Sequence, residues 1–204
     1  MSRFHPLPPS FYDRSAELVA PDLLGRYLVR ELEGLRLVLR IVETEAYLGR
    51  IDRAAHAWNG RRTARNESLY LPGGHAYVYF VYGMHFCLNA VTGGAEEGGA
   101  VLLRGAEPVA GEGAMVRHRG LVGARRPGDV AGGPAKICQA LRVDRELDGV
   151  RLDCGALRIT QGEPTPAGEI ARGPRIGIRY AQEAVDWPLR FAVAGNPHVS
   201  LPRL

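Results

Sequence analysis

Lysine and cysteine are both scarce in this chain. Lys136 is the only lysine among 26 basic residues, so the other 25 are arginines. Arginine suits bidentate contacts with phosphate, although a GC-rich coding sequence also produces such a skew. The three cysteines, Cys87, Cys138 and Cys154, are far apart and form no CxxC pair. This spacing argues against a disulfide framework or a zinc ribbon and favours reduced thiols.

Long apolar runs are also absent. The longest, residues 76–91, contains His85 and Asn89 and is too short and too polar to cross a bilayer. The N-terminus lacks the apolar segment of a signal peptide. We therefore expect a cytoplasmic protein with no membrane partner.

The bulk composition is that of an ordinary globular protein. The 204 residues are 46% hydrophobic and 24% charged, which predicts one domain over residues 1–204 with a substantial core. The formal charge of +4 favours a polyanionic partner without proving one.

The clearest periodic segment covers residues 35–47. Alternate residues of a strand share a face, and here an apolar face leads into two acids and a tyrosine: Leu35, Leu37, Leu39, Ile41, Glu43, Glu45 and Tyr47. We expect this strand to carry a carboxylate from the core to the rim of a pocket.

The remaining elements predict a mixed α+β fold. A short helix is expected over residues 15–24, and the apolar runs 76–82 and 84–91 read as a hairpin with Tyr82 at its tip. A strand is expected at 100–104, stopped by Pro108, and a helix begins at Pro134. Further strands are expected near 156–160, 175–179 and 189–194. The fold class is thus a mainly antiparallel curved sheet with flanking helices and a protruding β-hairpin.

Glu43 and Glu45 are the first candidates for chemistry. A carboxylate beside apolar residues has a raised pKa and becomes a better proton acceptor near neutral pH. The alternative is a structural pair bound to arginines such as Arg40 or Arg104. The pattern alone does not choose between the two acids.

Other polar and aromatic residues give weaker signals. The tyrosines are Tyr47, Tyr77, Tyr79 and Tyr82, and core packing is the ordinary role of strand tyrosines; a ring at a hairpin tip, however, could wedge into a base stack. A metal site could be formed by His56, His75 and His85 with Asp52, but no metal-binding spacing is present. We therefore expect no metal and no cofactor.

Seven stretches together resemble the alkyladenine (3-methyladenine) DNA glycosylase family. They follow family order over most of the chain: residues 40–49, 54–56, 61–66, 77–89, 101–108, 133–141 and 173–177. The resemblance implies a DNA glycosylase of base excision repair that flips damaged purines, such as 3-methyladenine, 7-methylguanine, hypoxanthine or ethenoadenine, out of duplex DNA.

The resemblance also implies roles for individual residues. Glu45 looks like the general base that activates water, with Glu43 supporting it, and Arg104 and the carbonyl of Ile176 look like groups that hold this water. Tyr47, His56 and Tyr79 look like the walls of the base pocket, Asn89 like the group that discriminates against guanine, and Tyr82 like the intercalating residue. Contacts to the DNA backbone are implied for Arg61, Thr63, Arg65, Gly83, Met84, Lys136 and Arg175.

The single lysine bears on mechanism. Bifunctional glycosylases attack the sugar with an amine, and Lys136 at a helix start suits phosphate instead. We therefore expect a monofunctional enzyme that leaves an abasic site. Separately, we expect it to be a monomer. His85 and the loop 111–130 depart from the family pattern, and we expect the N-terminal extension of some members to be missing here. A binding module without chemistry, a metal-dependent hydrolase or deaminase, and an acyl or formyl transferase are the alternatives.

Overall fold

The computed structural model of the chain describes residues 4–81, 83–123 and 125–204. Within these ranges the helices are α1 (Pro9–Tyr12), α2 (Ala16–Asp22), α3 (Glu112–His118) and α4 (Pro134–Leu141). The strands are β1 (Tyr27–Leu32), β2 (Leu35–Tyr47), β3 (Ala76–Val81), β4 (His85–Thr92), β5 (Gly99–Ala110), β6 (Leu157–Thr160), β7 (Ile170–Gly173) and β8 (Arg190–Val193). Short 3₁₀ turns lie at Gly49–Ile51, Trp58–Gly60, Glu67–Tyr70, Arg145–Leu147, Ala167–Glu169 and Gln182–Asp186.

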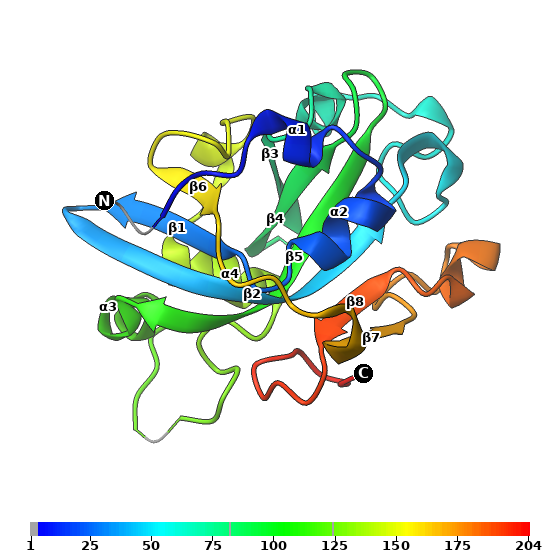
Figure 1. Cartoon of the computed structure of the whole chain (residues 1–204). Helices are drawn as coiled ribbons and strands as arrows, with labels where there is room; N and C mark the ends of the chain where they lie inside the picture. Colours follow the sequence, from blue (N-terminus) through cyan, green and yellow to red (C-terminus); the bar gives the residue numbers. More distant parts are fainter. Residues whose placement is uncertain (1–3, 82, 124) are drawn as a thin grey trace.

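All eight strands belong to one curled antiparallel sheet (Figure 1). Its order is β3-β4-β5-β2-β1-β6, and the β7–β8 hairpin joins through β8 to the end of β2. The long strands β2 and β5 form the centre of the sheet. Since β2 has β5 on one side and first β1, then β8, on the other, residues 43–45 lie between two strands. This fixes the backbone of the acidic segment from both sides.

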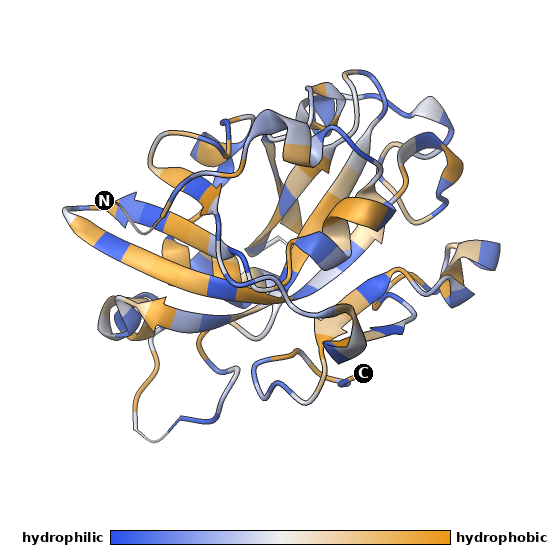
Figure 2. Cartoon of the chain, viewed as in Figure 1, coloured by the Kyte–Doolittle hydropathy of each residue, from blue (hydrophilic) through white to orange (hydrophobic). Residues whose placement is uncertain are grey.

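The main core packs between the sheet and the helices α2 and α4. Helix α2 packs on β2 and β5, and α4 packs on β4 and β5. Both helices contribute fully buried apolar side chains, and the alternation of hydrophobic and hydrophilic residues along β2 is visible in Figure 2. Among the described residues, no helix is long and apolar enough to cross a membrane.

The expected fold class is confirmed: an α+β domain built on a curved, mainly antiparallel sheet with flanking helices. The helix at 15–24, the 35–47 strand, the 76–91 hairpin, the helix from Pro134 and the strands near 156–160 and 189–194 all form, with ends shifted by a few residues. Two expectations are wrong. Strand β5 continues through Pro108, which pairs with Leu39 beside a register shift where a missing N–H is tolerated. Residues 175–179 form no strand; the strand of that region is β7, a few residues earlier. Strand β1 was not anticipated.

The expectation that one face of β2 runs unbroken from Leu35 to Tyr47 is also wrong. The pairing with β5 passes from Ile41–Ala106 to Glu43–Gly105, so Val42 is an extra, bulged residue. Ile41 and Ala46 lie in the main core, whereas Val42 packs with Ala192 on the other side. A β-bulge re-aims the side chains that follow it. The bulge, not the alternation, turns both acids away from the main core.

Candidate active site

A cavity of about 390 Å³ opens between the second half of β2, the β3–β4 hairpin and the segment after β7. It is lined mainly by aromatic and apolar side chains with a few polar groups, a composition typical of pockets for flat organic ligands. The polar and aromatic lining residues are Glu45, Tyr47, His56, Tyr77, Tyr79, His85, Asn89, Arg104 and Tyr180. The cavity therefore brings together one acid, one buried arginine and several rings.

Glu45 lies at the buried side of this cavity and is fully covered. Its Oε2 accepts a 2.9 Å hydrogen bond from the Tyr47 hydroxyl, and its Oε1 accepts a 2.8 Å bond from the Ile176 amide. Burial raises the pKa of Glu45 above its ordinary value of 4.5, while Arg104, the Ile176 N–H and the Tyr47 hydroxyl lower it in part. Such a carboxylate can accept a proton more readily than an exposed one.

Glu43 occupies a different environment, although only one residue separates it from Glu45. It is fully buried and accepts hydrogen bonds from Arg190 Nε at 2.7 Å, Ser200 N at 2.7 Å and Ser200 Oγ at 3.0 Å. It does not line the cavity in the described part of the chain. This distinguishes the acids: Glu45 reaches the cavity, and Glu43 ties the end of the chain to β2.

Arg104 of β5 connects the two acids. Its Nε lies 3.2 Å from Glu43 Oε1 and 3.5 Å from Glu45 Oε1. Within the described residues this Nε forms no hydrogen bond, although it is buried. Its N–H is therefore available to a third group placed beside Glu45.

Three rings form one wall of the cavity. Tyr77 and Tyr79 of β3 stack with ring centroids 5.3 Å apart, and the His56 ring packs edge-on against Tyr79 at 4.6 Å. The Tyr77 hydroxyl lies 2.7 Å from His56 Nδ1. Desolvation and the guanidinium groups of Arg65 and Arg61 lower the pKa of His56, so the neutral imidazole is favoured.

Asn89 lies across the hairpin from Tyr77 and is buried. Its amide Nδ2 donates to the Tyr77 carbonyl at 3.1 Å, which fixes the orientation of the side chain. The neighbouring Cys87 faces the same cavity, and burial raises the pKa of its thiol. A fixed amide in an otherwise apolar wall can discriminate between ligand edges.

A second cavity of about 320 Å³ adjoins the first and shares His56, Tyr77 and Tyr180 with it. Its rim carries Arg53, Arg61, Thr63 and Arg65. Asn66 organises this rim: its Oδ1 accepts from Thr63 N and Oγ1, and its Nδ2 donates to the carbonyls of His56 and Arg61. The aromatic cavity thus continues into a positively charged surface.

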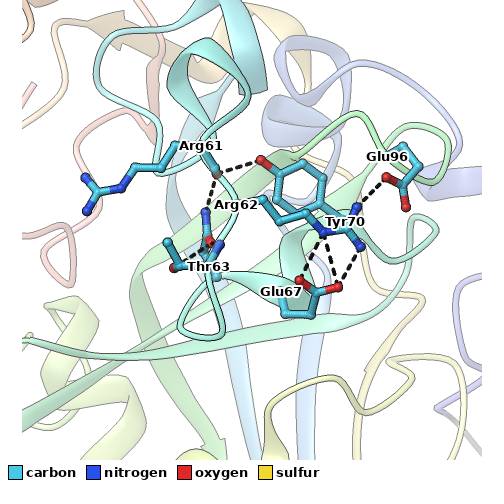
Figure 3. A network of polar contacts seen from close by, with 7 residues as sticks. Arg61, Arg62, Thr63, Glu67, Tyr70 and Glu96 are labelled. Carbon is cyan, nitrogen blue, oxygen red and sulfur yellow. Dashed lines mark hydrogen bonds and ion pairs between the residues drawn. The ribbon is translucent and has the colours of Figure 1, made fainter.

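Arg61 of this rim and its chain neighbour Arg62 behave differently, as Figure 3 shows. Arg62 stacks over the Tyr70 ring, 4.6 Å from its centroid, and pairs with Glu67 and Glu96. The Arg61 side chain points away from this network, while its carbonyl accepts from the Tyr70 hydroxyl at 2.6 Å. Among the described residues, no carboxylate pairs with Arg61.

Comparison with known proteins is consistent with this geometry. The sequence profile of the family described as "Methylpurine-DNA glycosylase (MPG)" matches residues 10–197. The chain belongs to the methylpurine-DNA glycosylase family. A protein of Carboxydothermus hydrogenoformans is 46% identical over 195 residues, covering 95% of this chain and 98% of the relative. Relatives of Myxococcus xanthus (44%, covering 95% and 93%) and Clostridium beijerinckii (40%, covering 93% and 96%) are similar. Each of the three is named "Putative 3-methyladenine DNA glycosylase".

Membership of the methylpurine-DNA glycosylase family confirms the resemblance found in the sequence. It identifies the chain as a DNA-repair glycosylase for alkylated bases, an enzyme that hydrolyses N-glycosyl bonds. The alternatives of a binding module, a deaminase or an acyl transferase are therefore excluded. His75, part of the metal alternative, binds the Pro72 carbonyl through Nδ1, and no three metal-ligating side chains cluster in the described ranges.

One of the backbone contacts expected for this glycosylase does not fit the structure. The Arg175 side chain is completely buried and forms an ion pair with Asp52, so it offers no surface to a phosphate. Lys136 Nζ donates to the Gly128 carbonyl at 3.0 Å, but the residue is only half-buried and its ammonium has further N–H donors. The phosphate contact of Lys136 therefore stays a prediction.

The hairpin tip of the glycosylase is described only in part. Tyr82, the expected intercalating residue, lies outside the described residues. Its neighbours Gly83 and Met84 are exposed, and Gly83 adopts a φ of 68°, which glycine tolerates without strain. Met84 and Phe80 are 68% and 40% exposed, so the tip presents apolar side chains to solvent.

Several site residues were not anticipated from the sequence. Asp52, Tyr180, Arg190 and Ser200 contact the catalytic segment or line the cavities, and Tyr77 does so beyond its expected packing role. Asp52 follows β2 closely in the chain, and from the sequence it was named only as part of the metal alternative. For Arg190 and Ser200 no local pattern is a signal, because they lie about 150 positions from Glu43 in the sequence and meet it only where β8 pairs with β2.

Proposed function

We propose that this chain is a monofunctional DNA glycosylase that flips alkylated or deaminated purines out of duplex DNA and hydrolyses the N-glycosidic bond with water activated by Glu45. The single observation that carries the proposal is Glu45 itself: a covered acid with a raised pKa at an aromatic cavity. The proposed substrate class contains 3-methyladenine, 7-methylguanine, hypoxanthine and ethenoadenine.

Flipping a base into the cavity has a cost that the ring-lined wall offsets. Unstacking a nucleotide costs a few kcal/mol, roughly, and stacking on aromatic rings contributes on the order of 1–3 kcal/mol per base. Tyr47 and Tyr79 are the rings we assign to this contact, with His56 at the edge. We assign Tyr82, on the sequence alone, to the gap that the flipped nucleotide leaves, supported by the exposed apolar side chains of Phe80 and Met84 beside it.

The chemical step needs a water molecule and a proton acceptor. The water oxygen bonds to the sugar C1′, its proton passes to Glu45, and the electron pair of the N-glycosidic bond leaves with the purine. A cationic purine such as 7-methylguanine becomes neutral in this step and is a good leaving group. Arg104 Nε–H and the Ile176 carbonyl are the groups we assign to hold the water. The ionised Glu45 also stabilises the positive charge that develops on the sugar.

Glu45 can serve this role only if one lone pair stays available. Each carboxylate oxygen has two lone pairs. The Ile176 amide and Arg104 face Oε1, and the Tyr47 hydroxyl uses one lone pair of Oε2, so the second lone pair of Oε2 is left for the water proton.

A neutral purine also needs a proton donor for its leaving nitrogen, and the residues assigned to the chemical step do not include one. We therefore rank cationic purines first.

Discrimination and DNA binding are assigned to the surrounding residues. We assign Asn89, whose side chain is held by the Tyr77 carbonyl, to crowding the exocyclic amino group of guanine. Arg61, Thr63 and Arg65 at the second cavity, with the backbone of Gly83 and Met84, are the proposed DNA backbone contacts. Because the only lysine, Lys136, already donates to the Gly128 carbonyl, we assign no amine-based lyase step to this enzyme.

A base-release assay with Glu45→Gln tests the proposal. Glutamine keeps the volume of the side chain but cannot accept the water proton, so 3-methyladenine and 7-methylguanine release from methylated duplex DNA should fall by about 10²–10⁴-fold, the usual size of general-base catalysis. Binding to the same duplex should stay close to wild type. Glu107→Gln, which removes a carboxylate from the Arg40 ion pair on β5, is the matched control. Equal release by Glu45→Gln and wild type would remove Glu45 from the mechanism.

A further inference from the structure

Behind the Tyr47 ring lies a fully buried ion pair, Asp52–Arg175, to which neither the sequence nor the family match assigns a function. Both side chains have no exposed surface. Arg175 Nη2 donates to Asp52 Oδ1 at 2.9 Å, and Nη1 pairs with Oδ2, so the contact is bidentate. A buried ion pair is weak evidence for stability, because desolvation offsets its attraction. Its position suggests another use.

Arg175 contacts the catalytic segment at two points, and its chain neighbour contacts it at a third. Its Cζ lies 4.7 Å from the centroid of the Tyr47 ring, in cation–π geometry. Its Nη1 donates to the Ala46 carbonyl at 2.8 Å, between Glu45 and Tyr47. The next residue, Ile176, donates its amide to Glu45. The buried guanidinium therefore holds the ring and the strand directly, and anchoring Arg175 also positions the adjoining Ile176 amide, which contacts the acid.

Asp52 holds the loop that leaves this strand. Its Oδ2 accepts from Leu48 N at 3.0 Å and its Oδ1 from Ala54 N at 2.9 Å. From Ala54 the loop leads within two residues to His56, which also lines the cavity. Asp52 thereby connects the end of β2 to the loop that carries His56, while it neutralises Arg175.

Arg175 lies on the side of the Tyr47 ring that faces away from the cavity. Tyr47 lines the cavity, whereas Arg175 is not among its described lining residues. A purine stacked on the cavity face would place its ring roughly 8 Å from the guanidinium, with the tyrosine between them. At this distance an unpaired buried cation would repel a cationic purine appreciably, and a paired one would not.

We propose that Asp52 and Arg175 are a positioning pair for the active site: Arg175 fixes the Tyr47 ring and the Ile176 amide, and Asp52 cancels its charge so that a cationic purine can stack on the other face of the ring. The proposal rests on the proposed function. It adds a specificity element, because cancelling the charge matters for cationic purines and little for neutral ones.

Single-turnover base release tests the pair. One duplex carries 7-methylguanine, which is cationic, and a second carries the neutral purine, hypoxanthine or ethenoadenine, that wild type releases faster. Asp52→Asn should lower the rate constant for 7-methylguanine at least about tenfold more than that for the neutral purine. The ratio of the two rate constants does not depend on the folded fraction. Glu107→Gln, which breaks a half-buried ion pair on β5, should leave the ratio unchanged.

A double variant separates charge from packing. Asp52→Asn with Arg175→Met removes both charges, so the ratio should return to near the wild-type value while both rates stay low, because the ring is no longer held. A purely structural pair would give the wild-type ratio in the single variant, or the same ratio in the single and double variants. Either result would overturn the proposal.

Arg175→Lys covers the case in which Asp52→Asn does not fold. Lysine keeps the charge but loses the bidentate fork and the flat stack, so it should slow release of both purines by similar factors of about tenfold. Wild-type rates in Arg175→Lys would overturn the positioning role. If wild-type protein and Glu107→Gln both fail to release 7-methylguanine, the proposed function itself fails, and this outcome is distinct from failure of the pair.

Discussion

The Tyr47 hydroxyl donates a 2.9 Å hydrogen bond to Oε2 of Glu45, two residues earlier on the same strand. The bulge at Val42 makes this possible by turning both side chains to the cavity side of β2. The ring proposed to stack on the purine is therefore coupled to the acid proposed to activate water. Any shift of the ring on base binding changes the hydrogen bonding, and hence the basicity, of Glu45.

Replacing Tyr47 with phenylalanine should raise the pKa of Glu45 further. The hydrogen bond from the phenol lowers this pKa, so without it the pKa-raising effect of burial is opposed by fewer groups. The proposed reaction needs the ionised carboxylate; activity should fall as the pH drops through this pKa. In Tyr47→Phe the acid limb of the pH–rate profile should move to higher pH, while the rate on the plateau stays within about tenfold of wild type because the ring remains. Single-turnover profiles from pH 5 to 9 measure this, and an unmoved acid limb would show that the phenol does not tune Glu45.

Glu45→Gln should make the protein at least as stable as wild type near pH 8. A folded-state pKa above 4.5 means that the fold favours the protonated acid. The stabilisation by this group is therefore present at low pH and is lost as the pH rises through the raised pKa. Glutamine mimics the protonated form, so we expect Tm to rise by about 2–4 °C at pH 8, the shift that about 1 kcal/mol causes in a chain of this size. The difference should shrink toward pH 5; a variant less stable than wild type at pH 8 would contradict this assignment.

Much of the framework around the site could be predicted from the sequence. The alternation in 35–47 predicts β2, the turn at Gly83 between two apolar runs predicts the β3–β4 hairpin, and Gly133-Pro134 predicts the start of α4. These signals are local: each depends on residues a few positions apart. The family resemblance then placed Glu45, His56 and Asn89 in one pocket, and the cavity does contain all three.

What could not be predicted depends on contacts between distant segments. The pattern did not separate Glu43 from Glu45, because the two acids differ in their hydrogen-bond partners. Arg190 and Ser200, about 150 positions away, bind the carboxylate of Glu43 and not that of Glu45. The resemblance implied a phosphate contact for Arg175, and no local pattern revealed its buried partner, Asp52, which is 123 positions away. The bulge at Val42 had no signal either, since valine is ordinary strand sequence and the extra residue is visible only in the pairing with β5.

Asn66→Ala should destabilise the rim of the second cavity. The buried amide makes four hydrogen bonds, two to Thr63 and two to the carbonyls of His56 and Arg61. Its removal takes this partner from the part-buried Thr63 N–H and His56 carbonyl, while the Arg61 carbonyl keeps the Tyr70 hydroxyl, and we expect a cost of about 1 kcal/mol of unfolding free energy. Thr63→Val removes only the hydroxyl bond and is the graded comparison. Urea unfolding measures both; a smaller loss in Asn66→Ala than in Thr63→Val would contradict the organising role of Asn66.

Arg61→Gln and Arg62→Gln should affect DNA binding unequally. The Arg61 side chain points away from the rim network in Figure 3, whereas Glu67 and Glu96 already pair with Arg62. A cation that neutralises one phosphate contributes about 0.9 to the slope of log K against log salt on duplex DNA. We expect Arg61→Gln to weaken binding to undamaged and damaged duplexes alike and to reduce this slope by about one, because a phosphate contact carries no sequence information. Arg62→Gln should leave the slope nearly unchanged, because Glu67 and Glu96 already pair with the Arg62 guanidinium.

Fluorescence anisotropy titrations between about 50 and 200 mM salt measure the slopes of both variants. If the two variants give equal slopes, Arg61 contributes no more to phosphate binding than Arg62 does, and the assignment of Arg61 is wrong.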